Sequence, residues 1–512
     1  MSLKRGSGVL LHPTSLPGPF GSGDLGADAF RFVDWLESAG QSCWQMLPIG
    51  GIGPGNSPYM SPSAFAGNPL LVDLAELQQR GWLAAEDLGA APPFEARRVD
   101  YAAVHAFRVL CLRRAAQRFF LAQNPADDAD FEQFCSVHGV WLDDYSLFMA
   151  LADDLDWKDW PGWPAPLARR EPAALREAEQ QHRPAVRFWK FVQWCFFRQW
   201  LALKTYANLH GVQIIGDIPI FIAFQSAEVW ARPDLFELDA DGLPSVVAGV
   251  PPDYFSETGQ RWGNPLYRWP AHADGAYEWW IARVRHATAL CDIVRIDHFR
   301  GFAGYWAIPA NEPTAVHGAW CTGPGAALFE AIEGALGGLP IIAEDLGVLT
   351  DDVIILRDRF AMPGMRILQF AFGGDAGNSF LPHRFVENTV VYTGTHDNDT
   401  SAGWWASASD HERAFVLAYL GVPAGASDAR PFAIHWALMN LASASVAALA
   451  IHPLQDILGL GSECRMNHPG KASGFWEWRF GWDQLGEDEA RRLHAMSVAH
   501  GRCVFKVPAL SV

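Results

Sequence analysis

The chain has 512 residues, of which 50% are hydrophobic and 19% are charged, and this balance indicates a folded globular protein rather than a disordered one. Its 57 acidic and 39 basic residues give a net charge of −18, which disfavours binding to nucleic-acid backbones or anionic membranes. A neutral ligand carries no such penalty. The sequence has no apolar run of about 18 residues, so no transmembrane helix is expected.

The N-terminal segment and the cysteines bear on the cellular compartment. Residues 1–19 contain only a short apolar run, interrupted by Pro and Gly, without the apolar stretch and cleavage site of a signal peptide. The eight cysteines are scattered, and no two form a C-x-x-C pair. This spacing predicts free thiols in a reducing compartment and no zinc site. We therefore expect a cytoplasmic protein.

Eight short apolar runs, most of them ending in polar or acidic residues, predict the strands of a parallel sheet. Runs that are apolar almost throughout are typical of strands buried on both faces. The stretch between the first two runs, 27–40, has one apolar helical face and Gly40 as a C-cap. Eight strands with helical connections predict an α/β protein with a (β/α)8 TIM barrel, although the last run also fits a helix. The runs are 8–13, 43–48, 212–219, 292–299, 339–347, 364–372, 389–398 and 445–456.

Two connections are far longer than one crossover helix needs. Residues 76–210 read as amphipathic helices, of which 187–211 is the clearest, and predict a helical subdomain inserted after the second strand. A second insertion, 221–285, follows the third strand, and its centre at 246–269 interleaves Gly and Pro with aromatic residues. That pattern is typical of an ordered surface loop whose apolar side chains pack onto another surface. The 23 tryptophans fit either a large aromatic core or stacking platforms for sugar rings.

Functional residues of a (β/α)8 barrel lie at the carboxyl ends of its strands, above a packed aliphatic interior. An acid at any one strand end could be a helix N-cap or a solvated edge, but four such ends in one chain favour a shared site. The candidates at the ends of the third, fourth, fifth and seventh predicted strands are Asp217, Arg295, Asp297, Glu344, His396 and Asp397.

Carboxylates around one barrel mouth, without an H-E-x-x-H metal motif, favour glycosyl transfer. A retaining enzyme needs a nucleophile and an acid–base about 5–5.5 Å apart, and neighbouring strands lie about 4.8 Å apart. Arg295, two residues before Asp297, would hold that carboxylate ionised. Burial would raise the pKa of Glu344, as an acid–base requires. Asp397 could bind sugar hydroxyls and favour positive charge at the anomeric carbon.

Nucleotide-binding and hydrolase motifs are weak or missing. Residues 21–26, GSGDLG, match G-x-G-x-x-G, but they follow a Pro-rich loop instead of a strand. They also lack the acidic residue that a dinucleotide site has about 20 positions further on. No G-x-S-x-G elbow and no Walker-type loop occurs.

Seven motifs, in order along essentially the whole chain, resemble those of the 4-alpha-glucanotransferases, also called amylomaltases or disproportionating enzymes, of glycoside hydrolase family 77. The motifs are LLHPTSLPGPFGSGDLG (10–26), SPYMSPSAFAGNP (57–69), GDIPIF (216–221), VRIDHFRG (294–301), IIAEDLG (341–347), YTGTHDND (392–399) and LGLGSECRMNHPG (458–470).

The resemblance implies one (β/α)8 catalytic domain over 1–512, with inserted subdomains and no separate C-terminal β-domain. It implies Asp297 as nucleophile, Glu344 as acid–base and Asp397 as the transition-state-stabilising carboxylate. A departure is Met60, where the family usually has Gln. Trp262 and His298 could instead be packing residues, and Tyr254 and Phe255 could close over bound glucan or only pack their loop. The implied substrate contacts are Ser57, Tyr59, Asp217, Gln260, Trp262, Arg295, His298, Asp375, His396 and Asn467.

The expected activity is transfer of a 4-alpha-glucanosyl segment from a donor alpha-1,4-glucan to the 4-OH of an acceptor glucan or glucose. The substrates would be maltooligosaccharides, amylose or glycogen chains, and no cofactor is implied. An alpha-amylase-type hydrolase would use the same carboxylates with water as the acceptor. A non-catalytic glucan-binding protein would keep the aromatic residues without needing the acids.

Overall fold

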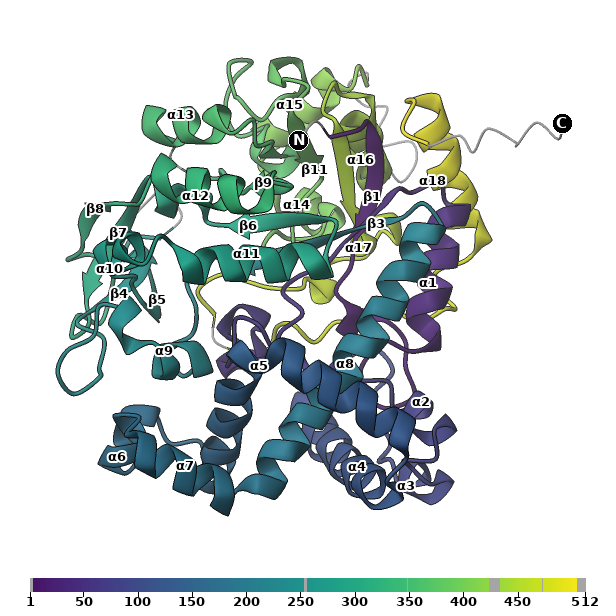
Figure 1. The fold of residues 1–512 in the computed structure, drawn as a ribbon. Helices are drawn as coiled ribbons and strands as arrows, with labels where there is room; N and C mark the ends of the chain where they lie inside the picture. The colour runs from purple at the N-terminus through teal and green to yellow at the C-terminus, as the bar shows by residue number, and fades with distance from the viewer. Residues whose placement is uncertain (1–2, 253–255, 348, 423–432, 472, 504–512) are drawn as a thin grey trace, which may run out of the picture.

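Eight parallel strands form a closed barrel at the centre of the molecule (Figure 1). The computed structural model describes residues 3–252, 256–347, 349–422, 433–471 and 473–503. The Ala343 N–H donates to the Pro363 carbonyl, just before β10, and so joins the two ends of the sheet. The predicted (β/α)8 barrel is confirmed. In spatial order its strands are β10 (Gly364–Ile367), β11 (Thr389–Tyr392), β12 (Leu449–Pro453), β1 (Gly6–Leu10), β2 (Cys43–Gln45), β3 (Gln213–Pro219), β6 (Ile293–Asp297) and β9 (Ile341–Ala343).

Each predicted apolar run overlaps one of these strands: β1 begins two residues before its run, and the other seven strands lie within theirs. The run 364–372 ends as a 3-10 helix, Leu368–Phe370, after β10. The run 445–456 holds β12 and then the short helix α17 (Leu454–Ile457), so it is part strand and part helix. The chain leaves the sheet at the barrel mouth, where polar residues that follow the apolar stretch face the site.

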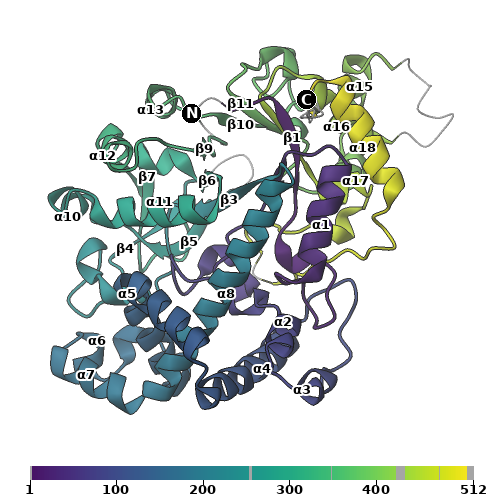
Figure 2. The same ribbon diagram turned by 45° about the vertical axis from the view of Figure 1, so that its right-hand side comes forward.

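Helices surround the strands, and α1 (Ala27–Ser38) illustrates how the sequence specifies them. Its apolar face is buried, and Gly40 follows the helix with φ +67°, a left-handed conformation that suits glycine. Figure 2 shows α1 beside α8 (Arg183–Leu209) against the barrel. The other outer helices include α11 (Glu278–Leu290), α12 (Ala326–Leu336), α13 (Asp351–Arg359), α14 (Ser401–Ser407), α15 (Asp410–Tyr419), α16 (Ile434–Ala444) and α18 (Glu487–Ala499).

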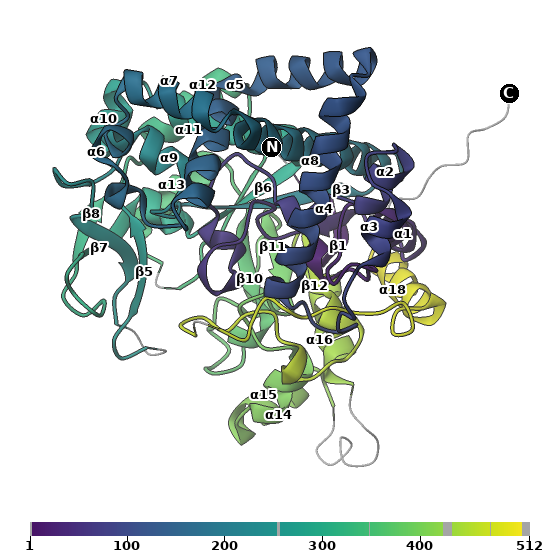
Figure 3. The ribbon, with the colours of Figure 1, turned by 90° about the horizontal axis from the view of Figure 1, so that it is seen from below.

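The connection between β2 and β3 is largely helical and forms a layer at one side of the barrel (Figures 1 and 3). Asp100 caps α4 and Asn124 caps α5, each accepting from backbone N–H groups of the first turn. The long helix α8 packs against α4 and α5 at one end and against α1 and β3 at the other. The helices before it are α2 (Leu74–Gln79), α3 (Ala85–Gly89), α4 (Tyr101–Ala122), α5 (Pro125–Asp154), α6 (Ala165–Ala168) and α7 (Pro172–Gln181).

A small antiparallel sheet stands beside the barrel, at the left of Figure 1. Two of its strands, β4 (Val246–Val250) and β5 (Gln260–Pro265), come from the connection after β3. The other two, β7 (Gly304–Pro309) and β8 (Ala319–Thr322), come from the connection after β6 and were not predicted from the sequence. The two short helices α9 (Ala227–Ala231) and α10 (Trp269–Asp274) lie in the same region of the chain.

One hydrophobic cluster runs from the barrel strands into the helical layer, so the two share a core. Most of the tryptophans lie in it, which favours the core interpretation of the high tryptophan content. All eight cysteines are free thiols. None of the described helices combines the length and apolar character that crossing a membrane requires.

Candidate active site

The predicted charged residues follow neighbouring barrel strands at their carboxyl ends. Asp217 of β3 lies in register with Arg295 of β6. Ile296 of β6 lies in register with Ala343 of β9, so Asp297 and Glu344 are the next residues on two adjacent strands. Parallel strands therefore bring residues that are far apart in sequence to one mouth.

Arg295 joins two of the carboxylates. Its Nη1 donates to Asp217 Oδ2 at 2.5 Å and its Nη2 to Asp297 Oδ1 at 2.9 Å. Asp217 is fully buried and Arg295 nearly so, whereas the Asp297 side chain keeps 28% of its exposure. Burial alone would lower the pKa of Arg295, but the two acids raise it, so the guanidinium stays charged. Asp297 is thus an anchored carboxylate that remains open to the mouth.

Glu344 sits in a different environment. The backbone N–H of His298 donates to its Oε2 at 2.6 Å, and that of Leu346 to its Oε1 at 2.9 Å. His298 adopts a left-handed conformation with φ 52°, which ends β6 and starts a 3-10 helix at Phe299. Burial, reinforced by the nearby charge of Asp297, raises the pKa of Glu344 to about 8. The carboxyl group is therefore protonated at neutral pH.

Tyr59 connects the loop after β2 to both sides of the site. Its hydroxyl donates to Asp217 Oδ2 at 2.8 Å and lies 2.9 Å from His396 Nε2. Burial raises the pKa of Asp217 to about 7, against the lowering effect of Arg295. When Asp217 is ionised, the hydroxyl gives it its one proton, and His396 Nε2 carries the proton of the second bond. Burial lowers the pKa of His396 despite the opposing charge of Asp397, and the ring is neutral at pH 7.

Asp397, which follows His396, is held by the chain segment after β12. Asn467 Nδ2 donates to Asp397 Oδ1 at 2.6 Å, and the Asn467 N–H donates to the His396 carbonyl at 3.0 Å. The Asp397 side chain is 42% exposed, so it faces the open mouth. Asn467 thus bonds to Asp397 through its side chain and to His396 through its backbone.

Trp262 of β5 brings the antiparallel sheet to the barrel. Its ring meets the His298 ring edge to face with centroids 4.8 Å apart, and its Nε1 donates to Gln260 Oε1 at 3.1 Å. Burial lowers the pKa of His298 to about 4, so this ring is also neutral. Tyr254 and Phe255 lie outside the described residues.

Among the described residues, Ser57 and Asp375 form no hydrogen bond with the acids of the site. Ser57 accepts at Oγ from the Tyr59 N–H at 3.3 Å, and so it caps the short helix that carries Tyr59. Asp375 is exposed in the loop after β10 and accepts from the Gly377 N–H at 2.8 Å. Among the described residues, no hydrogen bond, ion pair or ring contact links Asp375 to the others. Met60 Sδ lies 3.6 Å from Asn264 Nδ2, another link between the Tyr59 loop and β5.

Arg465 belongs to the site but was not predicted. Its Nη2 donates to the Asp397 carbonyl at 2.5 Å, across 68 positions of sequence. Arg465 lies inside the motif 458–470, but its contact with Asp397 depends on how the chain folds back after β12. In the described parts of the chain, no group of three or more His, Cys, Asp or Glu side chains is placed to hold a metal ion.

Comparison with known proteins places the chain in a family. The family model described as 4-alpha-glucanotransferase matches residues 11–483. The 4-alpha-glucanotransferase of Thermus thermophilus is 51% identical over 504 residues, which cover 98% of this chain and 100% of that protein. The 4-alpha-glucanotransferase of a Synechocystis strain is 48% identical over 505 residues, with 98% and 99% covered.

A solved structure agrees with these sequence matches. The amylomaltase of Streptococcus agalactiae, solved in complex with acarbose, superposes with a TM-score of 0.94 at 37% identity, covering 98% of this chain and 100% of that one. The barrel and its ring of acids define a glycosyl-transferring enzyme of the glycoside hydrolase type. The chain belongs to the 4-alpha-glucanotransferase family, as its motifs predicted. These matches support transferase activity over the hydrolase alternative.

Proposed function

We propose that this protein moves a 4-alpha-glucanosyl segment from a donor alpha-1,4-glucan to the 4-OH of an acceptor glucan or glucose. The observation that carries the proposal is the contrast between two acids on adjacent strands. Arg295 donates to the Asp297 carboxylate, while burial raises the pKa of Glu344 to about 8. An anionic nucleophile beside a protonated acid is the pair that a retaining double displacement requires.

The first half of the reaction cleaves the donor. The Glu344 carboxyl group gives its proton to the glycosidic oxygen as the C1–O bond breaks. Asp297 attacks C1 from the opposite face and forms a covalent glucosyl-enzyme, while the donor's reducing-end portion departs with the proton. Asp397, open to the mouth, stabilises the positive charge that develops at the anomeric carbon.

The second half transfers the segment. Glu344, now ionised, takes the proton from the acceptor 4-OH, whose oxygen attacks C1 and releases Asp297. Transfer to sugar rather than to water requires acceptor contacts that exclude solvent, and Trp262 beside His298 is suited to that role. We assign donor contacts to Tyr59, Asp217, Arg295 and His396, and further substrate contacts to Ser57, Gln260, Trp262, His298, Asp375 and Asn467.

The partners we propose are maltooligosaccharides and the chains of amylose or glycogen. The location stays a prediction, because the names of the relatives point to more than one compartment: that of Solanum tuberosum is called chloroplastic/amyloplastic.

Incubation with maltotriose, followed by separation of the products by chain length, tests the proposal. Transfer yields glucose together with maltopentaose and longer chains, with no net growth in reducing ends. Glucose and maltose together with a growing number of reducing ends would mean that water is the acceptor. That outcome would contradict the proposed solvent exclusion by Trp262.

The nucleophile is tested separately with Asp297→Asn. The amide cannot form the glycosyl-enzyme, so transfer activity falls by about 10⁴-fold or more, as expected when a covalent step is lost. Mass spectrometry of the protein with a slow-reacting glucosyl fluoride should show a covalent adduct in the wild type and none in the variant. Transfer close to the wild-type rate would remove Asp297 from this role.

A further inference from the structure

The segment 461–467, which follows β12, lies against the loop after β11 that carries His396 and Asp397. Ser462 Oγ donates to Asp399 Oδ2 at 2.7 Å at one end of this contact. Asn467 bonds to His396 and Asp397 at the other end. Arg465 lies between these two points and is half-buried.

Two nitrogen atoms of Arg465 form hydrogen bonds, and both donate to backbone carbonyls. Its Nη2 donates to the Asp397 carbonyl at 2.5 Å and its Nε to the Asn467 carbonyl at 2.5 Å. The planar guanidinium is a rigid fork, so these bonds set the spacing between the two residues. Burial lowers the pKa of Arg465, whereas the charges of Asp399 and Asp397 raise it.

Asp397 needs such support because its own side chain has little else to hold it. The carboxylate is 42% exposed; Asn467 Nδ2 donates to its Oδ1 at 2.6 Å, and His396 Nε2 lies 3.5 Å from the same oxygen. Arg465 holds the backbone of Asp397 and also the backbone of Asn467, which is the residue that orients the carboxylate.

We propose that Arg465 is a positioning residue that acts through Asp397. The inference rests on the proposed role of Asp397 in stabilising the transition state. A displacement of about 1 Å at a catalytic group can cost about 10²-fold in rate. The Asp397 N–H also donates to Thr395 Oγ1 at 3.3 Å, so loss of the Arg465 fork releases the carbonyl end of Asp397. It also loosens the amide that orients the Asp397 carboxylate, and so it weakens a contact made mainly in the transition state.

The first test is the effect of Arg465→Ala on maltotriose transfer. We expect kcat to fall by about 10²-fold while KM changes little, because the ground-state contacts of the sugar remain. Arg413→Ala is the matched control: Arg413 also bridges two backbone carbonyls, those of Trp405 and Ala406, but outside the site. Equal losses of activity in both variants would overturn the proposal.

A double-mutant cycle separates positioning from a general structural effect. In the Asp397→Asn background, Arg465→Ala should change kcat by no more than about twofold, because the group it positions is already gone. Independent, multiplicative losses would show that Arg465 does not act through Asp397. If Asp397→Asn alone kept wild-type activity, the proposed role of Asp397 would fail instead.

The conservative variant Arg465→Lys provides a third measurement and serves if Arg465→Ala does not fold. The lysine ammonium can reach a carbonyl but lacks the fixed fork, so kcat should recover only in part. A Lys variant as slow as the Ala variant, with the same thermal midpoint as wild type, would contradict the positioning role.

Discussion

At the scale of single residues, two carboxyl groups on adjacent strands differ in what surrounds them. Asp297 accepts from a buried guanidinium, whereas Glu344, among the residues the structure describes, accepts only from the backbone N–H groups of His298 and Leu346. The sequence predicted both acids at the mouth, Arg295 beside Asp297 and a buried Glu344, but it did not predict the two backbone donors to Glu344. The backbone donors depend on the left-handed turn at His298.

The first prediction concerns the pH dependence of transfer. Glu344 must be protonated to act as the acid, and its pKa is raised to about 8. The kcat/KM for maltotriose should therefore hold below that pH and fall as the pH rises through about 8, a limb that a pH–rate profile measures. A profile that falls already near the ordinary glutamate pKa of 4.5 would contradict the raised value.

The second prediction concerns stability. Between the ordinary pKa of 4.5 and the folded value of about 8, the folded protein keeps a proton on Glu344 that the unfolded chain has lost. The free energy of unfolding therefore decreases with rising pH in that window, by at most about 1.4 kcal/mol per pH unit and less because the group is partly open to solvent.

Glu344→Gln removes this titration. The variant should be less active but more stable than wild type, with a gain that grows from pH 5 to about pH 8, measured by urea unfolding. Glu179→Gln, on the exposed surface of α7, is the control and should keep the wild-type slope. Parallel pH dependence in Glu344→Gln and wild type would refute the prediction.

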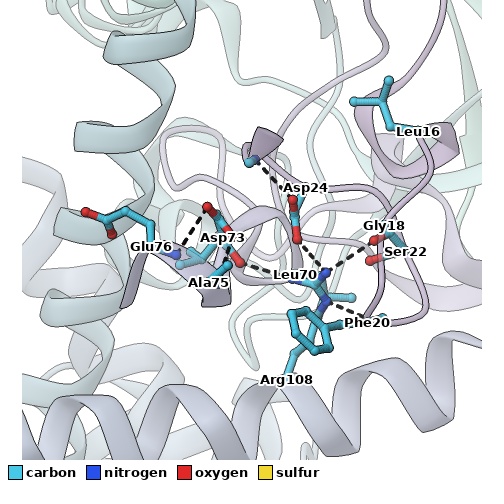
Figure 4. Close-up of polar contacts among 12 residues, drawn as sticks. Leu16, Gly18, Phe20, Ser22, Asp24, Leu70, Asp73, Ala75, Glu76 and Arg108 are labelled. Atoms are coloured by element: carbon cyan, nitrogen blue, oxygen red, sulfur yellow. Dashed lines mark hydrogen bonds and ion pairs between the residues drawn. The ribbon is translucent and has the colours of Figure 1, made fainter. Parts of the chain in front are cut away.

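At the scale of elements, the GSGDLG loop at 21–26 fastens α4 to the barrel instead of binding a nucleotide. Arg108 of α4 is fully buried, and its Nη2 donates to Asp24 Oδ2 at 2.8 Å (Figure 4). The same guanidinium donates to the carbonyls of Phe20, Ser22 and Val72. Asp24 also accepts from the Gly26 N–H at 3.0 Å, so the loop's carboxylate is already engaged.

This arrangement makes Arg108 a large contributor to stability. Arg108→Met leaves Asp24 buried without its ion partner, and the free energy of unfolding should fall by about 3–5 kcal/mol. Arg113→Met on the same helix removes a pair with Asp153 whose side chains are 46% and 28% exposed. That control should cost about 1 kcal/mol or less. Urea unfolding compares them, and equal losses would contradict the difference in burial.

The elements themselves were predictable where their signal is local. Eight apolar runs correctly predicted eight barrel strands, because a strand buried on both faces has apolar residues at nearly every consecutive position. The strands β7 (GYWAIP) and β8 (AWCT) were missed, since β7 joins the sheet by pairing with β4, which lies before β6 in the chain, and β8 joins it by pairing with β7. Pairing between distant segments leaves no local pattern.

At the scale of the whole molecule, the net charge of −18 allows a prediction about salt. A neutral glucan gains nothing from the protein's field, so kcat/KM for maltotriose should change by less than about twofold between about 0.05 and 0.5 M NaCl. The urea midpoint of unfolding should rise over the same range, because salt screens the self-repulsion of an acidic chain. A steep salt dependence of kcat/KM would indicate that a charged group on the protein governs substrate capture.

The sequence by itself determined the barrel, the family and the acids at the strand ends, because apolar periodicity and short motifs are properties of neighbouring residues. Tertiary structure alone decided the bonds from the His298 and Leu346 N–H groups to Glu344, and those from Arg465 and Asn467 to Asp397. It also paired Asp24 with the buried Arg108, so that the loop around Asp24 holds α4. Such contacts join residues far apart in the chain, and their geometry exists only once the strands and helices have packed.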